Sequence, residues 1–314
     1  MKKILIVFVL LLVAAVACIY VFIPRQLKVS HIEQAATNDK WTFSFLMNAS
    51  EWRKWWPSDN STVRGSADTL FHYNKLSFKP DSLFFNALNI NIEADGNAIV
   101  SKMYLVPVGF NKVQMEWQCE LDGGNNPFTR WMQYKRAVAI KNGMAGILSS
   151  YKKWLEVPEH LYGFDVKPGK IIDTLLVAAI ASFKSYPTPE QVDTVFQVLR
   201  KYIEKNNAEV SGYPMLHVVI NEAGVYEAQM ALPINKVIPE TDAISIKSMF
   251  AGNALITKIK GGNYTIAKAF EACEYYKADH DRSSPAIPFQ SMITNRVTET
   301  DTAKWETIIY CPVY

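Results

Sequence analysis

The sequence is poor in cysteine and histidine, which argues against a disulfide-stapled fold and against a metal site. Its four cysteines are Cys18, Cys119, Cys273 and Cys311, and Cys18 lies inside an N-terminal apolar segment. One disulfide among the other three would leave a free thiol, and no Cys-x-x-Cys spacing suggests a metal. The five histidines are scattered, and Asp-His-Asp at 279–281 is the one local acid–histidine cluster. We therefore expect neither a disulfide framework nor a bound metal.

Neither sign of charge dominates, and this argues against nucleic acid as a partner. The 314 residues include 33 basic and 30 acidic side chains, a formal net charge of +3, without a long run of lysine and arginine. No zinc-finger or other DNA-binding signature is present in the sequence. Proteins that bind nucleic acid usually carry a basic patch or stripe. We expect no nucleic-acid partner, and the sequence does not specify a protein partner.

Recognisable catalytic motifs are also missing. The sequence has no Gly-x-Ser-x-Gly, His-Glu-x-x-His, phosphate-binding loop or Gly-x-Gly-x-x-Gly. These are patterns that position a nucleophile, a metal-bound water or a phosphate. His217 lies within the apolar stretch Met-Leu-His-Val-Val-Ile and is interpreted as a structural histidine. No catalytic residue and no cofactor is predicted, and a non-enzymatic role is favoured over an enzymatic one.

A long apolar run at the start of the chain is the clearest feature that is present. Residues 4–24 are uncharged and mostly apolar. About 20 helical residues at 1.5 Å each span roughly 30 Å, the hydrocarbon thickness of a bilayer. Ala-Val-Ala-Cys at 15–18 resembles a lipoprotein cleavage box, but the apolar run continues beyond it, unlike the shorter core of a signal peptide. A single-pass transmembrane anchor in residues 1–26 is therefore favoured over a signal peptide or a lipoprotein.

The charges that flank this run indicate an orientation. The α-amine, Lys2 and Lys3 precede the run, and Arg25 and Lys28 follow it. The more positive flank of a membrane span tends to stay in the cytoplasm. The narrow excess before the run favours a single-pass membrane protein whose bulk lies on the non-cytoplasmic side.

Residues 27–159 have the mixed pattern of an α+β domain. The stretch 38–57 is dense in tryptophan, and these tryptophans are interpreted as core and helix-packing residues. Alternating apolar and polar residues predict strands, at 27–32, 69–73, 88–92, 99–105 and 112–119. Gly-Gly-Asn-Asn-Pro at 123–127 interrupts the pattern, and a long helix is predicted over 131–155.

Early helices, a strand meander and one long closing helix are the element order of a helix-grip fold. The stretches Glu-Trp-Arg-Lys-Trp-Trp-Pro (51–57) and Val-Gln-Met-Glu-Trp (113–117), together with the closing helix, resemble the START-like (SRPBCC, polyketide-cyclase-like) superfamily. The resemblance covers residues 27–159. It implies a curved antiparallel sheet wrapped around the last helix, and often an apolar ligand cavity.

After a predicted linker at 160–168, residues 169–314 repeat one pattern of elements. Each half has a strand, a helix and two further strands, and a recurring element order predicts a tandem β-α-β-β domain. In the first half, Thr188 is the predicted N-cap of the helix and Pro189 its first residue. The strands are predicted at 170–183, 213–220, 224–234, 249–259, 287–294 and 303–313.

This tandem pattern over residues 169–314 resembles the GyrI-like family, the effector-binding domain also attached to AraC-type and multidrug-sensing transcription regulators. The features that carry the resemblance are Lys-Ile-Lys-Gly-Gly-Asn-Tyr-Thr-Ile-Ala-Lys-Ala-Phe-Glu-Ala-Cys-Glu-Tyr-Tyr (258–276), Pro288-Phe289, and Trp-Glu-Thr-Ile-Ile-Tyr-Cys-Pro-Val (305–313). The resemblance implies an aromatic groove between the two halves. In the family an acid four residues before the closing proline often meets cationic, flat, apolar ligands, and some members are hydrolases.

The acids of this chain depart from that pattern by two residues. Ile308 and Gln229 stand four positions before the closing prolines, where the family has its acid. Glu306 and Glu227 stand two positions earlier. Because strand side chains alternate, a shift of two keeps the same face and moves the carboxylate roughly 7 Å along the strand. A cation site remains geometrically possible, but it cannot be transferred residue by residue.

The last predicted strand, at 303–313, contains the main candidate for a ligand-binding acid. With period two, Thr307, Ile309 and Cys311 point one way and Glu306 and Tyr310 the other. Glu306 in an aromatic pocket would attract a cation, helped by cation–π contacts. The alternative is a solvated Glu306 paired with Lys304 or Arg296. The predicted ligand-binding residues are Glu306, Glu227, Tyr310, Tyr264, Tyr226 and Phe289.

Together these features predict a membrane-anchored α+β protein with two ligand-cavity domains. The favoured function is non-enzymatic binding, sensing or sequestration of a small apolar or cationic amphipathic molecule. One alternative is a hydrolase of small electrophilic compounds that uses the GyrI-like domain. A further alternative is an interaction module without a ligand. The expected ligand-binding function depends partly on the resemblance of the two domains to known folds, and that part is an argument by analogy.

Overall fold

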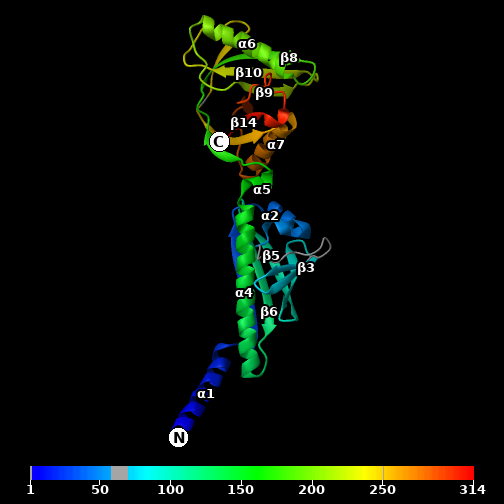
Figure 1. Ribbon diagram of the computed structural model, residues 1–314, viewed down its shortest axis with the longest axis vertical. Coiled ribbons are helices and arrows are strands. Elements are labelled where there is room, and N and C mark those ends of the chain that lie inside the picture. The colour runs from blue at the N-terminus through cyan, green and yellow to red at the C-terminus, as the bar shows by residue number, and fades with distance from the viewer. Residues whose placement is uncertain (1, 58–69, 250) are drawn as a thin grey trace. The chain divides into compact units, whose positions relative to one another are not determined.

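Two separate antiparallel β-sheets organise the chain (Figure 1). The computed structural model describes residues 2–57, 70–249 and 251–314. The chain divides into two units, Met1–Val157 and Pro158–Tyr314, and each contains one of the sheets. The mixed α+β class predicted from the sequence is confirmed.

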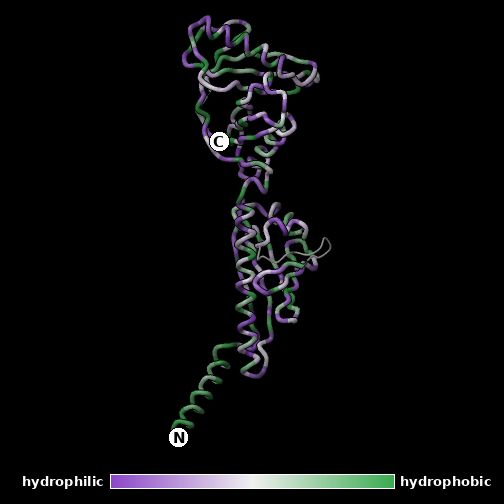
Figure 2. Tube along the Cα trace, in the orientation of Figure 1, coloured by the Kyte–Doolittle hydropathy of each residue, from purple (hydrophilic) through white to green (hydrophobic). Residues whose placement is uncertain are grey.

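The N-terminal apolar run forms one helix, α1 (Lys2–Phe22), which Figure 2 shows as a continuous hydrophobic segment. It has the length and composition of a membrane span or of a signal sequence. Its C-terminal end is fixed to the rest of the first unit, because the Tyr20 hydroxyl donates to the Asn125 carbonyl at 2.7 Å. Arg130 lies over the Tyr20 ring and donates to the Ile23 carbonyl at 3.3 Å.

The sheet of the first unit has six strands in the order β1-β6-β5-β4-β3-β2. Most neighbours in this order are also consecutive in sequence, so the sheet is a meander closed by β1 against β6. Its elements are β1 (Gln26–Ala35), α2 (Asp39–Met47), α3 (Trp52–Trp55), β2 (Phe71–Tyr73), β3 (Leu76–Leu83), β4 (Ala87–Ala94), β5 (Asn97–Gly109), β6 (Lys112–Asp122) and α4 (Pro127–Leu155).

The closing helix α4 begins four residues earlier than predicted. Asn126 caps it, because its side chain accepts from the Thr129 amide at 2.7 Å, and Pro127 occupies the first turn. Asparagine as N-cap and proline at the first position are both favourable. Asn126 and Pro127 were predicted to interrupt the regular secondary structure, but they are the N-cap and the first residue of α4. The predicted strand at 69–73 begins at residue 69, outside the described residues.

Side chains fill most of the space between α4 and this sheet. Trp52 and Trp117 are fully buried, and the Trp117 indole donates to the Ser101 hydroxyl at 2.8 Å. Trp55 and Tyr151 pack together with ring centroids 4.3 Å apart. The interpretation of Trp52 and Trp55 as core residues is confirmed. A void of about 10 Å³ lies between α2 and the sheet, and a larger hollow, about 720 Å³, has a largely polar and charged lining where β5 and β6 separate.

The second unit contains an eight-stranded sheet in the order β11-β8-β10-β9-β13-β14-β12-β7. The element order β8-α6-β9-β10 recurs as β12-α7-β13-β14, and the two sets of strands are mirrored about the β9–β13 pair. The elements are α5 (Pro158–Tyr162), β7 (Lys167–Lys170), β8 (Leu175–Phe183), α6 (Pro189–Lys205), β9 (Met215–Ile220), β10 (Tyr226–Pro233), β11 (Ser245–Ser248), β12 (Asn253–Lys260), α7 (Asn263–Asp279), β13 (Phe289–Met292) and β14 (Glu306–Pro312).

Two local details of this unit refine the sequence-based boundaries. Thr188 and Gln191 form a reciprocal capping box at the start of α6, with Pro189 in the first turn, so the predicted cap is confirmed. Residues 160–168, predicted as a linker, hold the end of α5 and the start of β7. Tyr162 explains part of this order, because its ring packs into the core under α7 and its hydroxyl donates to Asp279 at 3.0 Å.

Both helices of the repeat pack on the same face of the sheet. Phe196 and Leu199 of α6 are buried against Leu216 and Met230. Under α7, Ile309 and Cys311 of β14 are buried in a second cluster. The opposite side chains of the same strands therefore form a face that neither helix covers, which we call the open face.

Candidate functional site: a cavity on the open face

A cavity of about 680 Å³ lies on the open face of the eight-stranded sheet. Its size falls within the range of small-molecule sites in proteins. Apolar and small side chains form most of its wall, and the cavity reaches across strands from both halves of the repeat. The described residues that line it are Ile171, Leu176, Ala178, Met215, Leu216, His217, Gln229, Met230, Ala231, Lys247, Ser248, Met249, Gly252, Asn253, Pro285, Ala286, Ile287, Phe289, Pro312, Val313 and Tyr314.

Strand register explains why these residues meet. Ser291 of β13 pairs with Met215 of β9, and Met215 in turn pairs with Ala231 of β10. Ala231 pairs with Ala178 of β8. Directly paired residues of antiparallel strands point to the same face. Four strands therefore present one continuous row, and its two alanines leave the space that the cavity occupies.

The polar groups in the wall are few. His217, Gln229 and Asn253 are the described lining residues with an imidazole or an amide side chain, and Lys247 is the described lining residue with a charged one. No described lining residue has a carboxylate side chain. A site of this composition favours an apolar ligand with at most a few hydrogen-bonding groups, and its described side chains offer a cation no counter-charge.

His217 is held in its neutral form by its surroundings. Burial lowers the pKa of its imidazole below the ordinary value, and a hydrogen bond with the Pro288 backbone partly opposes this. A buried imidazole loses the hydration that stabilises its charged form. At neutral pH the wall beside His217 is therefore uncharged.

This lowered pKa predicts a pH dependence of stability. Because the folded-state pKa of His217 lies below its unfolded value, the unfolded chain takes up the proton first as the pH falls. The stabilising effect of a neutral His217 is thus complete above the pKa that this residue has in the unfolded chain. It is lost as the pH falls below that value. We expect the free energy of unfolding of the second unit to fall between about pH 7 and 5.5, and His217→Gln to flatten that slope. Urea titrations of both proteins at each pH measure it; parallel slopes would contradict the assignment.

Two of the predicted site residues lie together at the cavity. Phe289 is 6% exposed and lines the wall. Tyr310, its partner in the β13–β14 ladder, stacks on it with ring centroids 5.0 Å apart and an interplanar angle of 13°. Burial, and secondarily the charge of Asp173, raises the pKa of the Tyr310 hydroxyl. The Phe289–Tyr310 stack thus supports the wall with a protonated phenol.

The other predicted residues lie away from the cavity. The Glu306 side chain is 54% exposed, with Lys260 Nζ 3.9 Å from its Oε1. Its ion-pair partner is thus Lys260, across the β12–β14 ladder, and not Lys304 or Arg296. Tyr264 is 78% exposed on the first turn of α7.

The first-half acid also has a local partner of its own. Glu227 accepts a hydrogen bond from the Asn221 amide at 2.8 Å. Tyr226 packs edge-on against Tyr186 with centroids 6.1 Å apart.

Glu227 and Glu306 share the open face but stand at opposite ends of it. Val219, the partner of Glu227, lies four residues beyond Met215 along β9. Glu306 lies two residues from Ile308 along β14, toward the opposite end of the sheet. Met215 and Ile308 are both level with Ser291 of β13. Six residues of offset correspond to about 20 Å along the strands, and three strand spacings to about 14 Å across. The two carboxylates do not converge on one ligand.

Most of the wall was not predicted from the sequence. Leu176, Ala178, Met215 and Ala231 were not selected, and His217 was selected only as a structural residue. The signal was present as one alanine on the open face of each of two strands, Ala178 and Ala231, because alanine leaves room where a larger side chain would fill the face. Which alanines oppose one another depends on cross-strand register, and this does not follow from either strand alone.

Comparisons with known proteins give structural neighbours without close sequence relatives. No family model and no curated protein matches the chain. Similar solved structures include the C-terminal domain of EcmrR, with 14% identity and a TM-score of 0.40 over 48% of this chain and 98% of that one. A hydrolase from Listeria innocua has 10% identity and a TM-score of 0.36, over 47% of this chain and 92% of that chain. SAV2435 bound to tetraphenylphosphonium has 12% identity and a TM-score of 0.31, over 48% of this chain and 93% of that chain.

Proposed function

We propose that the protein binds a small, uncharged, apolar molecule in the open-face cavity, without transforming it. The observation that carries this proposal is a cavity of about 680 Å³ with apolar walls and no carboxylate side chain among its described lining residues. Burial of apolar ligand surface contributes roughly 25 cal/mol per Å². A ligand that covers Phe289, Met215 and Leu176 would gain its affinity mainly in this way.

Three finer assignments accompany the proposal. We infer that the second unit is a GyrI-like effector-binding domain, since its two β-α-β-β halves place both helices on one face and leave the other free. We infer a START-like helix-grip fold for the first unit from its six-stranded meander and the long helix α4. We propose that α1 anchors the chain in a membrane with both units on the non-cytoplasmic side, so that the ligand is captured near that surface.

Titration with Nile red, a neutral apolar dye, tests the proposal. The titration uses the chain from residue 27 onward. The apolar helix α1 would require lipid or detergent, and the dye would partition into either. We expect saturable binding with one site per chain and a blue-shifted emission from the bound dye. Absence of saturable binding, or saturation that persists after removal of Pro158–Tyr314, would overturn the assignment to this cavity. The hydrolase alternative stays a prediction, and turnover of reactive esters by the purified protein would favour it.

The two carboxylates provide a separate prediction. Glu306→Gln and Glu227→Gln are each expected to change the dissociation constants of Nile red and of competing tetraphenylphosphonium less than about fivefold, since a solvent-screened charge contributes at most about 1 kcal/mol. Both acids lie outside the cavity, and each already has a local partner. Competition titrations of the two variants measure this. A loss of cation affinity beyond fivefold in either variant would restore the carboxylate hypothesis.

A further inference from the structure

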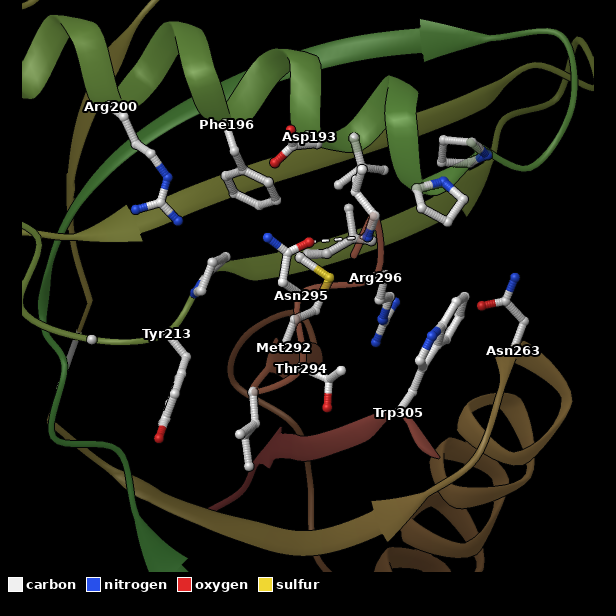
Figure 3. Close-up of a pocket in the computed structure, with 18 of the residues that line it drawn as sticks. Asp193, Phe196, Arg200, Tyr213, Asn263, Met292, Thr294, Asn295, Arg296 and Trp305 are labelled. Atoms are coloured by element: carbon white, nitrogen blue, oxygen red, sulfur yellow. Dashed lines mark hydrogen bonds between the residues drawn. The ribbon is translucent and has the colours of Figure 1, made fainter. Parts of the chain in front are cut away.

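A second cavity of about 300 Å³ lies on the helix-covered side of the same sheet (Figure 3). Its walls come from α6, from the segment before β9 and from the connection between β13 and β14. Asp193, Phe196 and Arg200 point from α6 toward Asn295 and Arg296 on the opposite wall. The side chains of this cavity are distinct from those of the open face, apart from Leu216, which lies in both linings.

Arg296 is the unusual group in this cavity. Its Nη2 donates to the Gln290 amide oxygen at 2.8 Å and to the Thr307 hydroxyl at 2.9 Å, both uncharged acceptors. Its Nε is buried without an acceptor. Within residues 2–57, 70–249 and 251–314 no carboxylate lies within ion-pair distance of it. A buried charge without a counter-charge is costly, and an anion that supplies one is bound strongly.

Arg296 nevertheless remains charged at neutral pH. Burial lowers the pKa of its guanidinium to about 10, which still leaves it protonated at pH 7. Its guanidinium lies 4.8 Å from the centroid of the Trp305 ring. This stacking holds the fork in one orientation, and a planar guanidinium matches the geometry of a carboxylate or a phosphate.

The remaining walls suit the apolar body of such an anion. Trp305, Phe196 and Met292 are 5%, 3% and 8% exposed and line the space beside Arg296. Asn263, the first residue of α7, also lines the cavity. The N-cap of α7 is Gly262, which provides no side-chain acceptor. The free amides of this helix end add a weaker positive potential.

Asp193 is the charge that opposes an anion here. Its carboxylate lies near the Gln197 amide, which donates to it at 3.4 Å and 3.5 Å, so it already has a partner on α6. Arg200, which is exposed, lines the same cavity. The described lining therefore has two cationic side chains and one acidic one, and Arg296 is the cationic one that stacks on Trp305.

We propose that this cavity binds a small organic anion, an aromatic or apolar body bearing a carboxylate or phosphate, with Arg296 as its counter-charge. The anionic group supplies the counter-charge that Arg296 lacks among the described residues, while Trp305, Phe196 and Met292 cover the body. The site is independent of the open-face cavity. Binding of an anion here and binding of a neutral ligand there can therefore succeed or fail separately.

Fluorine NMR of three matched probes with the full-length chain in neutral detergent micelles tests this proposal. The probes are para-fluorobenzoate, para-fluorophenyl phosphate and the uncharged para-fluorobenzamide, each corrected for its partition into empty micelles. We expect at least one anion to bind at least tenfold more tightly than the amide, a difference of about 1.4 kcal/mol. The tighter of the two anions identifies the head group. Equal binding of the amide and both anions would overturn the proposal.

Variants separate a binding role of Arg296 from a structural one. Arg296→Gln is expected to weaken anion binding at least tenfold and leave the amide unchanged, whereas a merely structural role would alter both. Two variants of partly or fully exposed residues on α6 keep the test valid if Arg296→Gln does not fold. Asp193→Asn should tighten anion binding and Arg200→Gln should weaken it, each by about two- to fivefold as for exposed charge pairs. Weaker anion binding by Asp193→Asn would contradict the proposal.

Discussion

Ala231→Trp is expected to raise the dissociation constant of Nile red at least tenfold. Ala231 lies on the open face, between Ala178 of β8 and Met215 of β9, and all three line the cavity. An indole at this position occupies the space that the dye needs, and the dye loses the apolar burial that drives its binding. A tenfold change corresponds to about 1.4 kcal/mol, which equals the burial of roughly 55 Å² of apolar surface.

The matched control adds the same side chain to the same face outside the cavity. Ser182 is exposed on β8, four residues from Ala178, and is not a lining residue. We expect Ser182→Trp to bind Nile red with unchanged affinity. Fluorescence titration gives the dissociation constants, and urea unfolding shows whether Ala231→Trp remains folded. Unchanged affinity of a folded Ala231→Trp would place the dye elsewhere and remove the support for the proposed function.

Local patterns in the sequence predicted several elements of this fold, but β3 and β11 were not predicted, and the strand predicted over 170–183 is divided between β7 and β8. Thr188, Pro189 and Gln191 specify the start of α6 because a helix cap depends on neighbours within three residues. The alternation along 305–313 correctly separated Ile309 and Cys311, buried under α7, from Tyr310 on the open face. Both depend only on the period of the chain, which is fixed by backbone geometry.

The environment of individual charges was less predictable, because it depends on residues distant in sequence. Glu306 is solvated beside Lys260, whose position opposite it is set by the β12–β14 register. Arg296, considered in the sequence analysis only as a partner of Glu306, instead stacks on Trp305 and donates to Gln290 and Thr307. A two-residue departure from a family pattern thus leaves an acid on the expected face but does not determine its partner.

The cavities were the least predictable features. The row of residues on the open face depends on three successive cross-strand pairs. These are Ser291 with Met215, Met215 with Ala231, and Ala231 with Ala178. Each pairing is set by connections and by core packing outside the strands concerned. The sequence could indicate that an apolar face exists. It could not indicate that two alanines and one histidine would meet there.

Trp52→Ala is expected to reduce the free energy of unfolding of the first unit by about 3–5 kcal/mol, the usual range for a buried aromatic side chain. Trp52 is fully buried and its indole donates to the Leu46 carbonyl at 3.0 Å. It lies between Trp55 and Phe71, each with a ring centroid 5.2 Å away. Removing it leaves a void against rigid aromatic neighbours, which can close only partly, and an unpaired carbonyl at Leu46.

Urea unfolding of the chain from residue 27 onward measures this change, and Trp131→Ala is its control. Trp131 is 43% exposed on α4, so its removal should cost less than about 1 kcal/mol. Nile red binding should survive in both variants, because the open-face cavity belongs to the other unit. A cost below about 1 kcal/mol for Trp52→Ala would mean that the aromatic cluster is loosely packed. The interior between α4 and the six-stranded sheet would then retain space for a ligand of its own, and the protein would have to be regarded as one with two apolar sites.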